Sequence, residues 1–393
     1  MSSRIGIAVI GFGWMGQAHC RSYSRLPMLF DDLAATPELV VCADTVEARR
    51  EQAVGRFGFG EAAADWRHAI ERPDVDVVVI TAPNMLHVEI AEAACAAGKH
   101  VFCEKPVGGT PAQTARAAAA ARAAAVITGV GYNYRFAPLV RYAKRLIDEG
   151  RLGTIVGYRG RFFSMYGSDP LGLLSWRFLQ DEAGYGVSSD LLSHVIDLAH
   201  LLVGPIRRLV GTRATTIAER PLPRPGEGTH YGRGAPGDPA GAVTNEDYAA
   251  LLVEFQNGAS GTFESSRVLV GPESEMAFEL YGTEGAVGWD LERLNELRLY
   301  LASDEPHTGW TTVLGGERFP PHGAFAPGNA LEIGFEDLIA IEDYEFLQAV
   351  AAGRPHEPGF EDALRYVEVQ DALVRSWSSG AWEDVRRLAE VTA

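Results

Sequence analysis

The sequence predicts an α/β protein of two domains, in which a doubly wound parallel sheet is followed by an α+β domain built on a mainly antiparallel sheet. The chain has 393 residues, which is too long for one ordinary hydrophobic core. Over residues 1–135, apolar strand patterns alternate with helical patterns, as they do in parallel sheets. Beyond residue 150, strand patterns follow one another with turn signals between them. We therefore expect domains at 1–135 and 136–393.

The composition is typical of a soluble globular protein, with 47% hydrophobic and 22% charged residues. The formal net charge of −17 argues against nucleic acid or an anionic membrane as the main partner. No apolar run approaches the roughly 20 residues that span a bilayer, and no secretory signal pattern precedes the first strand. Four cysteines without CxxC spacing predict neither a metal site nor a disulfide framework, and they fit a reducing cytoplasm.

The stretch RIGIAVIGFGWMGQAH (residues 4–19) joins an apolar strand to a helix through glycines in G-x-G-x-x-G spacing. Three glycines alone indicate only a turn, but a preceding strand and a following helix are the context of a dinucleotide-binding turn. The first glycine permits the turn, the second lets the backbone approach a pyrophosphate, and the third lets the helix pack on the strand. The helix N-terminus offers N–H groups to phosphates. The predicted cofactor-binding residues here are Gly11, Phe12, Gly13, Trp14, Met15 and Gly16.

A second strand, ELVVCADT, ends in Asp44. An acid at this place hydrogen-bonds the adenosine ribose and repels a 2′-phosphate, so NAD is favoured over NADP. Asp44 follows the glycines by more than the usual spacing of about 20 residues, because RLPMLFDDLAATP lengthens the segment between them. Arg49 and Arg50 lie in the next predicted helix, and we interpret them as surface charges.

Further strand and helix patterns continue the parallel sheet. Strands are predicted at 75–83, 99–106 and 126–134, and helices at 84–98 and 110–125. In such sheets, ligands bind at the carboxyl ends of the strands.

Two of these strand ends carry polar residues. Taken alone, Asn84 favours a helix N-cap, His87 is as typical of a structural histidine as of a ligand contact, and Lys105 is typical of a solvated lysine. A lysine before a proline at the mouth of a nucleotide crevice is nevertheless a better candidate for a functional residue than most lysines. The cofactor-binding set that we predict at these strand ends comprises Pro83, Asn84, His87, Glu104 and Lys105.

The stretch SDLLSHVIDLAHLL (189–202) predicts a largely buried helix with a polar stripe. Asp190, His194 and Asp197 stand at i, i+4 and i+7, which places them on one helix face. Buried carboxylates are costly unless something specific holds them. From the spacing alone, the stripe has two interpretations: one wall of an active site, or a set of buried polar caps on a core helix.

These motifs together resemble the glucose-fructose oxidoreductase / inositol dehydrogenase (Gfo/Idh/MocA) family. The resemblance rests on GFGWMG at 11–16, TAPNMLH at 81–87, CEKP at 103–106 and the helix at 189–202, and it covers nearly the whole chain. It implies a Rossmann domain joined to a large, open-faced, mostly antiparallel sheet, and NAD(H)- or NADP(H)-dependent chemistry on sugars, inositols and related polyols. The long segment before Asp44 and GPIRRLVGTRATTIAERP are most similar to levoglucosan-dehydrogenase-like and inositol-dehydrogenase-like members.

The resemblance also implies roles for single residues, with Lys105, Asp190 and His194 as the catalytic trio. Oxidising a secondary alcohol requires a base for the hydroxyl proton, which suits His194, and a group that stabilises the developing charge on oxygen, which suits Lys105. Asp190 orients the imidazole or pairs with Lys105. The predicted substrate-binding residues are Lys105, Tyr134, Trp176, Asp190, His194 and Asp197, and Trp176 and Arg177 are also placed near the cofactor.

Beyond residue 150, Asn257-Gly258 is a strong hairpin signal, and we expect an antiparallel meander. A broad sheet with one open face needs a partner, so a homo-oligomer, dimer or tetramer, is expected through that face. The Pro/Gly-rich segment 221–242 is a surface insertion or an arm over a neighbouring subunit. Two amphipathic helices within 335–378 are expected to pack back toward the first domain.

The leading functional hypothesis is an NAD-dependent dehydrogenase that oxidises a secondary ring hydroxyl of a sugar, anhydrosugar or glycoside to a keto sugar. The alternatives are an inositol 2-dehydrogenase, and a sugar oxidoreductase or NAD-dependent glycosidase that keeps its cofactor bound and releases no NADH. A third class, a dinucleotide-sensing regulator, would not need Lys105 and His194.

Overall fold

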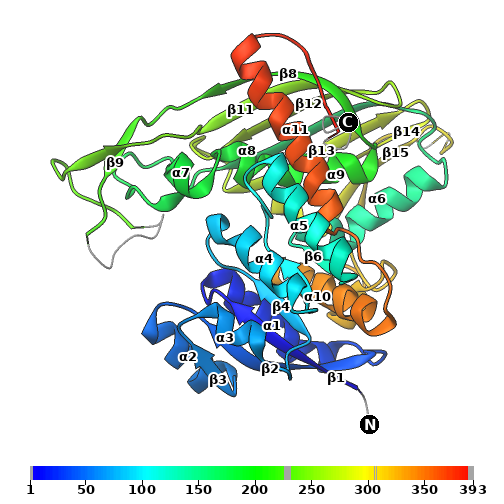
Figure 1. Ribbon diagram of the computed structural model, residues 1–393. Coiled ribbons are helices and arrows are strands. Elements are labelled where there is room, and N and C mark those ends of the chain that lie inside the picture. The colour runs from blue at the N-terminus through cyan, green and yellow to red at the C-terminus, as the bar shows by residue number, and fades with distance from the viewer. Residues whose placement is uncertain (1–2, 225–231, 305, 307, 388–393) are drawn as a thin grey trace. The chain divides into compact units, whose positions relative to one another are not determined.

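The computed structural model describes residues 3–224, 232–304, 306 and 308–387. It divides the chain into two compact units. The first comprises Met1–Phe136, Pro320–Pro327 and Ile333–Arg365, and the second comprises Ala137–Phe319, Gly328–Glu332 and Tyr366–Ala393. The predicted fold class is confirmed, because one unit holds a parallel sheet and the other a large, mainly antiparallel one (Figure 1).

The first unit is built on a six-stranded parallel sheet of order β3-β2-β1-β4-β5-β6. The order reverses between β1 and β4, which is the switch point where such sheets bind their ligands. Its strands are β1 (Ser3–Ile10), β2 (Ala35–Ala43), β3 (Glu61–Ala63), β4 (Val77–Ile80), β5 (His100–Cys103) and β6 (Thr128–Val130). Its helices are α1 (Trp14–Leu29), α2 (Glu47–Phe57), α3 (Trp66–Glu71), α4 (His87–Ala96), α5 (Pro111–Ala124) and α10 (Phe335–Ala352), with 3-10 turns η1 (Asn84–Leu86), η2 (Asn133–Phe136) and η5 (His322–Ala324).

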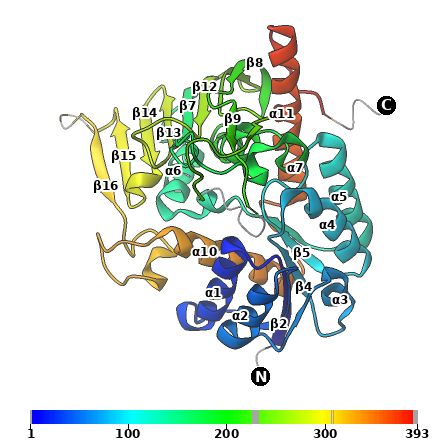
Figure 2. The same ribbon diagram turned by 90° about the vertical axis from the view of Figure 1, so that its left-hand side faces the viewer.

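Helices cover both faces of this sheet. Ile7 and Val9 of β1 face a core that includes residues of α1 and α10, and Ala8 and Ile10 face a second core with residues of α4 and α5. This alternation follows from the two-residue period of a strand. The helix α10 lies beside α1 although more than 300 residues separate them in the chain (Figures 1 and 2).

The second unit is built on a nine-stranded sheet of order β16-β15-β14-β13-β7-β12-β11-β8-β17 (Figure 2). Within the described strands of this sheet, only the β7–β12 pair is parallel. The Asn257-Gly258 hairpin joins β11 to β12 as predicted. The strands are β7 (Ile155–Ser164), β8 (Ile206–Ala214), β11 (Tyr248–Phe255), β12 (Ser260–Ser266), β13 (Ser274–Gly282), β14 (Gly285–Asp290), β15 (Glu296–Leu301), β16 (Thr311–Leu314) and β17 (Glu383–Asp384).

Helices pack against one face of this sheet, with α9 against β7 and α6 against β14 and β15. The helices are α6 (Pro138–Asp148), α7 (Gln180–Ala183), α8 (Val187–Asp190), α9 (Leu192–Leu202) and α11 (Phe360–Ser379), with 3-10 turns η3 (Trp176–Phe178) and η4 (Leu291–Arg293). The short strands β9 (Glu219–Pro221) and β10 (Ala240–Ala242) pair at the ends of the predicted 221–242 insertion, of which residues 225–231 lie outside the described residues.

The predicted helix at 189–202 is not one helix. α8 ends at Asp190 and α9 begins at Leu192. The Ser193 hydroxyl donates to the Asp190 carbonyl (3.1 Å), while the His194 N–H donates to the carbonyl of Leu191 (3.2 Å). A side chain that competes for a backbone acceptor interrupts the regular helical ladder, so the prediction of one continuous helix was wrong at Leu191.

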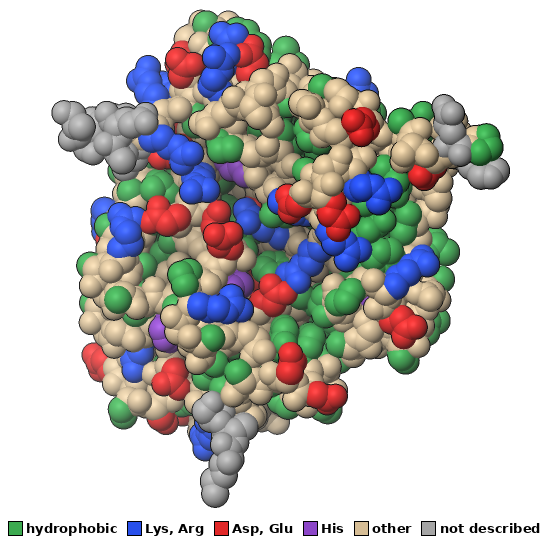
Figure 3. All heavy atoms as spheres, turned by 90° about the vertical axis from the view of Figure 1, so that its right-hand side faces the viewer, with side chains coloured by type: hydrophobic (Ala, Val, Ile, Leu, Met, Phe, Trp, Pro, Cys, Tyr) green, Lys and Arg blue, Asp and Glu red, His purple; other side chains and the backbone are tan. Residues whose placement is uncertain are grey.

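Positive and negative side chains are interspersed on the molecular face drawn in Figure 3. Of the helices that the structure describes, none combines the length and the apolar character needed to cross a membrane.

Candidate active site

The glycine turn between β1 and α1 leaves room for a phosphate group. Gly11 has a φ of +93°, and a Cβ there would lie 2.6 Å from the carbonyl oxygen of Thr81. A Cβ at Gly16 would lie 2.2 Å from the oxygen of Gly11. A Cβ at Gly13 would meet no atom within 4 Å, so open space lies directly against the backbone before α1. This is the arrangement that a dinucleotide pyrophosphate requires.

Asp44 ties the end of β2 to this turn. Its carboxylate accepts the N–H of Phe12 (2.7 Å) and the N–H of Val46 (2.8 Å). The Arg49 guanidinium lies 3.4 Å from the same carboxylate, so this arginine is paired with Asp44 as well as facing solvent. Each carboxylate oxygen has a second lone pair for a ribose hydroxyl, and the residues present therefore fit an NAD adenosine.

The two other predicted residues of the turn have different surroundings. Trp14 is 62% exposed and stacks on Phe335 of α10, with ring centroids 5.6 Å apart. The ring of Tyr134, which is buried in η2, also packs near Phe335, with ring centroids 6.2 Å apart. Met15 is half-buried. The substrate-binding role predicted for Tyr134 stays a prediction.

His87 joins the ends of two neighbouring strands. Its Nδ1 lies 2.8 Å from the carbonyl oxygen of Pro106, and its Nε2 lies 2.7 Å from that of Ala82. Burial lowers the pKa of His87 despite the opposing effect of these carbonyls. Both ring nitrogens face protein atoms, so a contribution to cofactor binding would come from holding these two segments. Pro83 and Asn84, also predicted at this edge, are exposed and half-buried respectively.

Glu104 and Lys105 follow β5 at the same sheet edge. The Lys105 N–H donates to the Glu104 carboxylate (3.1 Å). Glu104 is buried, and its other oxygen lies 3.5 Å from Nε2 of His19. Lys105 itself is half-buried. A buried carboxylate thus contacts the backbone of the predicted catalytic lysine.

In the second unit, the partners of Asp190 include Tyr166 and Arg177 from the segment before α8. The Tyr166 hydroxyl donates to its carboxylate (3.0 Å), and the Arg177 guanidinium lies 3.4 Å away. Arg177 also lies over the ring of Trp176, 4.8 Å from its centroid. Burial, followed by the negative charge on Asp190, raises the pKa of Tyr166. Tyr166 was not predicted from the sequence, because it lies in an irregular loop where no motif or periodicity marks it.

The remaining two members of the stripe are buried in α9. His194 and Asp197 are 6% and 4% exposed, and the ring of Phe162 lies 6.0 Å from that of His194. Burial, and then the charge on Asp197, raises the pKa of Tyr158. Lys105 belongs to the first unit and His194 to the second, so their meeting in one catalytic trio stays a prediction.

Within the parts of the chain that the structure describes, no group of three or more His, Cys, Asp or Glu is placed to hold a metal ion.

Comparisons with known proteins match both units. A family model described as "Oxidoreductase family, NAD-binding Rossmann fold" matches residues 5–132, and the "GFO/IDH/MocA C-terminal domain" model matches residues 140–288. Levoglucosan dehydrogenase from Pseudarthrobacter phenanthrenivorans is 37% identical over 387 residues, covering 98% of this chain and 99% of that protein. Inositol 2-dehydrogenase from Rhizobium meliloti is 24% identical over 378 residues, covering 96% and 97%. The solved structure of levoglucosan dehydrogenase with NADH and levoglucosan matches with a TM-score of 0.92 at 36% identity, covering 98% of this chain and 100% of that one.

Proposed function

The chain belongs to the GFO/IDH/MocA family of oxidoreductases, and from that premise we propose that it is an NAD-dependent dehydrogenase whose substrate is an anhydrosugar of the levoglucosan type. The observation that carries the proposal is the match to levoglucosan dehydrogenase over 98% of this chain. The NADH and levoglucosan complex of that enzyme shares the whole fold. The similarity to inositol 2-dehydrogenase makes a cyclic polyol the second candidate substrate.

The first unit binds the cofactor, and bound NAD supplies the hydride acceptor. In our proposal the N–H groups at the start of α1 hold the pyrophosphate, with Gly13 giving the close approach. Asp44 receives the ribose hydroxyls and disfavours a 2′-phosphate. Lys105, fixed at its backbone by Glu104, donates to the substrate oxygen and stabilises the negative charge that develops on it.

The second unit binds the sugar in this proposal. His194 accepts the hydroxyl proton, and Asp190, held by Tyr166 and Arg177, orients the imidazole. Asp197 receives further substrate hydroxyls. Trp176 offers an apolar face to the C–H surface of the ring.

NADH formation by the full-length protein tests the proposed reaction. The assay uses NAD, with NADP in parallel, across levoglucosan, inositols, free hexoses and simple glycosides. We expect turnover with NAD and levoglucosan, with kcat/KM lower by at least roughly 10-fold for the inositols. Turnover with inositols alone would contradict the anhydrosugar assignment. Dinucleotide binding without NADH release from any of these substrates would favour a mechanism that keeps its cofactor bound.

Two substitutions test the assigned roles. Lys105→Ala and His194→Ala should each lower kcat by about 100-fold or more, while the Kd for NADH stays within about threefold. Lys144→Ala and His68→Ala, which remove the same side chains from the surface, are the matched controls. A large loss of NADH affinity with kcat retained would refute these roles.

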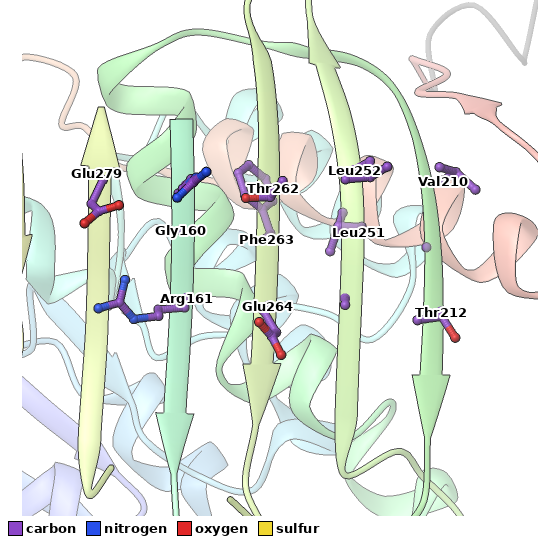
Figure 4. Close-up of a pocket in the computed structure, with 13 residues that line it drawn as sticks. Gly160, Arg161, Val210, Thr212, Leu251, Leu252, Thr262, Phe263, Glu264 and Glu279 are labelled. Carbon is purple, nitrogen blue, oxygen red and sulfur yellow. The ribbon is translucent and has the colours of Figure 1, made fainter. Parts of the chain in front are cut away.

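We also propose that the chain forms a homo-oligomer through the sheet face that lies opposite its helices. Arg161, Leu252, Thr262 and Glu264 alternate with buried residues along β7, β11 and β12 and line a shallow depression on this face (Figure 4). Leu252 is 51% exposed, and a second copy of the sheet would cover it.

A cytoplasmic location is part of the proposal, supported by four free, buried thiols.

Light scattering after size exclusion tests the assembly. Leu252→Asp places a charge at the centre of the proposed interface and should lower the measured mass toward that of one chain. Val54→Asp, at a 45% exposed position of α2, should not. A wild-type mass equal to 42.5 kDa would refute the proposed oligomer directly.

A further inference from the structure

His19 lies entirely inside the first unit, between two carboxylates from distant parts of the chain. It follows the glycine turn on α1 and is 0% exposed. Its Nδ1 lies 2.9 and 3.1 Å from the two oxygens of Asp343 on α10. Its Nε2 lies 3.5 Å from an oxygen of Glu104, at the end of β5. One ring therefore connects α1, α10 and the sheet edge that carries Lys105.

The ring carries a positive charge in this setting. Burial alone would lower the pKa of His19, but the charges and hydrogen bonds of Asp343 and Glu104 outweigh it and raise the pKa to about 10. A neutral imidazole has one N–H and can donate to only one of these carboxylates, whereas the protonated ring donates to both. Charge-assisted hydrogen bonds of this kind are the strong ones in a protein interior.

The other titratable groups around the ring do not replace this charge. Cys20 and Tyr23 lie on α1, and burial raises the pKa of both well above its usual value, so both stay neutral. Glu342 lies beside Asp343 on α10 and is also buried. His19 therefore supplies the positive charge between the carboxylates of Asp343 and Glu104.

Glu104 has little freedom to move away from His19. A Cβ at Gly131, at the end of β6, would lie 2.8 Å from the Glu104 carboxyl atoms, so the backbone of that segment closes the space on the other side. The second oxygen of Glu104 accepts the N–H of Lys105 (3.1 Å). The Glu104 carboxylate therefore contacts both the His19 ring and the Lys105 backbone.

We propose that His19 is a positioning residue for the reaction: anchored by Asp343, its ring holds the Glu104 carboxylate and thereby fixes the backbone of Lys105. The proposal rests on the proposed function, which assigns Lys105 to the substrate oxygen. Displacements of about 1 Å at a reacting group cost on the order of 100-fold in rate, so a residue buried behind the lysine can control turnover without touching substrate.

A pair of substitutions separates the two hydrogen bonds of the ring. The amide nitrogen of asparagine can take the place of Nδ1, so His19→Asn keeps the contact to Asp343 and loses the one to Glu104. Glutamine reaches the place of Nε2, so His19→Gln keeps the contact to Glu104. We expect His19→Asn to lower kcat by roughly 10- to 100-fold and His19→Gln to restore part of that loss, with the Kd for NADH within about threefold in both.

A second readout does not depend on turnover. The chain contains three lysines, Lys99, Lys105 and Lys144, so lysine labelled with ¹⁵N gives three backbone amide signals, and Lys105→Arg identifies the one of interest. His19→Asn should shift the Lys105 amide signal and leave those of Lys99 and Lys144 in place. Glu104→Gln should shift the same signal, and its effect on kcat should be non-additive with that of His19→Asn.

An unmoved Lys105 amide signal in folded His19→Asn or His19→Gln protein would overturn the inference, as would an unchanged kcat. A change in melting temperature with kcat and the amide signal unaltered would show a structural role only and would also overturn it. A wild-type protein without turnover on any sugar would refute the proposed function instead, while the amide signal would still decide whether His19 positions Lys105.

Discussion

The buried imidazolium of His19 makes a specific prediction for the pH dependence of folding. In the folded chain its pKa is raised to about 10, and in the unfolded chain it returns to about 6.5. Between these values the folded state binds one proton more than the unfolded state, so stability falls as pH rises. The contribution of His19 is fully present below about pH 6.5 and is lost as pH rises through 10.

The magnitude follows from the width of this window. One proton corresponds to about 1.4 kcal/mol per pH unit, so the whole shift is worth about 5 kcal/mol. Between pH 6.5 and 8 the expected fall in the free energy of unfolding is about 2 kcal/mol. Among the other shifted groups, the raised pKa values of Cys20, Cys103 and Tyr23 act above this interval, and the lowered pKa values of His87 and His100 act mainly below it.

Urea unfolding followed by circular dichroism at several pH values from 6.5 to 8 measures this slope. His19→Asn should unfold at lower urea concentration than the wild type at pH 6.5, and the difference should shrink as pH rises. His68→Asn, the same substitution at a half-exposed position of the same unit, should keep the wild-type slope. Parallel curves for the wild type and His19→Asn over this interval would refute the protonated ring.

Three further substitutions test the glycine turn, a buried ion pair and the choice between NAD and NADP. Gly16→Ala places a Cβ 2.2 Å from a backbone oxygen and should weaken NADH binding by on the order of 10-fold in a fluorescence titration. Gly55→Ala, whose Cβ would meet no atom within 4 Å, should leave the affinity unchanged. Equal affinities of the two variants for NADH would count against the tight turn. In the interior, the Arg267 guanidinium lies 2.8 Å from the Asp247 carboxylate, and Arg267→Met leaves that carboxylate without its cation. The free energy of unfolding, measured by urea denaturation, should fall by about 3–5 kcal/mol. A change below about 1 kcal/mol would contradict this account. Asp44→Ser should lower the ratio of kcat/KM for NAD to that for NADP by about 10-fold, and an unchanged ratio would remove Asp44 from cofactor selection.

Local patterns in the sequence were sufficient for the architecture. The glycine turn at 11–16, the alternation of strands and helices up to β6, and the Asn257-Gly258 hairpin each depend on a few adjacent residues. Backbone conformation and burial periodicity are properties of such short segments. The fold class, the family and the NAD cofactor could therefore be predicted from the order of the amino acids alone.

The same local reasoning failed where a side chain competes with the backbone. Spacing alone placed Asp190 on one helix with His194, but the Ser193 hydroxyl takes the Asp190 carbonyl and the helix breaks at Leu191. Hydrophobic periodicity reports which face is buried, and it does not report how each backbone acceptor is satisfied.

Only the tertiary structure decided the partners of the buried charges. Asp343 reaches His19 across 324 positions of sequence, and Tyr166 reaches Asp190 from an irregular loop. The strength of such pairs depends on the removal of water and on distances of a few ångströms. Neither quantity exists until the chain has folded, so sequence patterns predicted Lys105 and Glu104 as site residues, while only the fold showed that His19 contacts the Glu104 carboxylate.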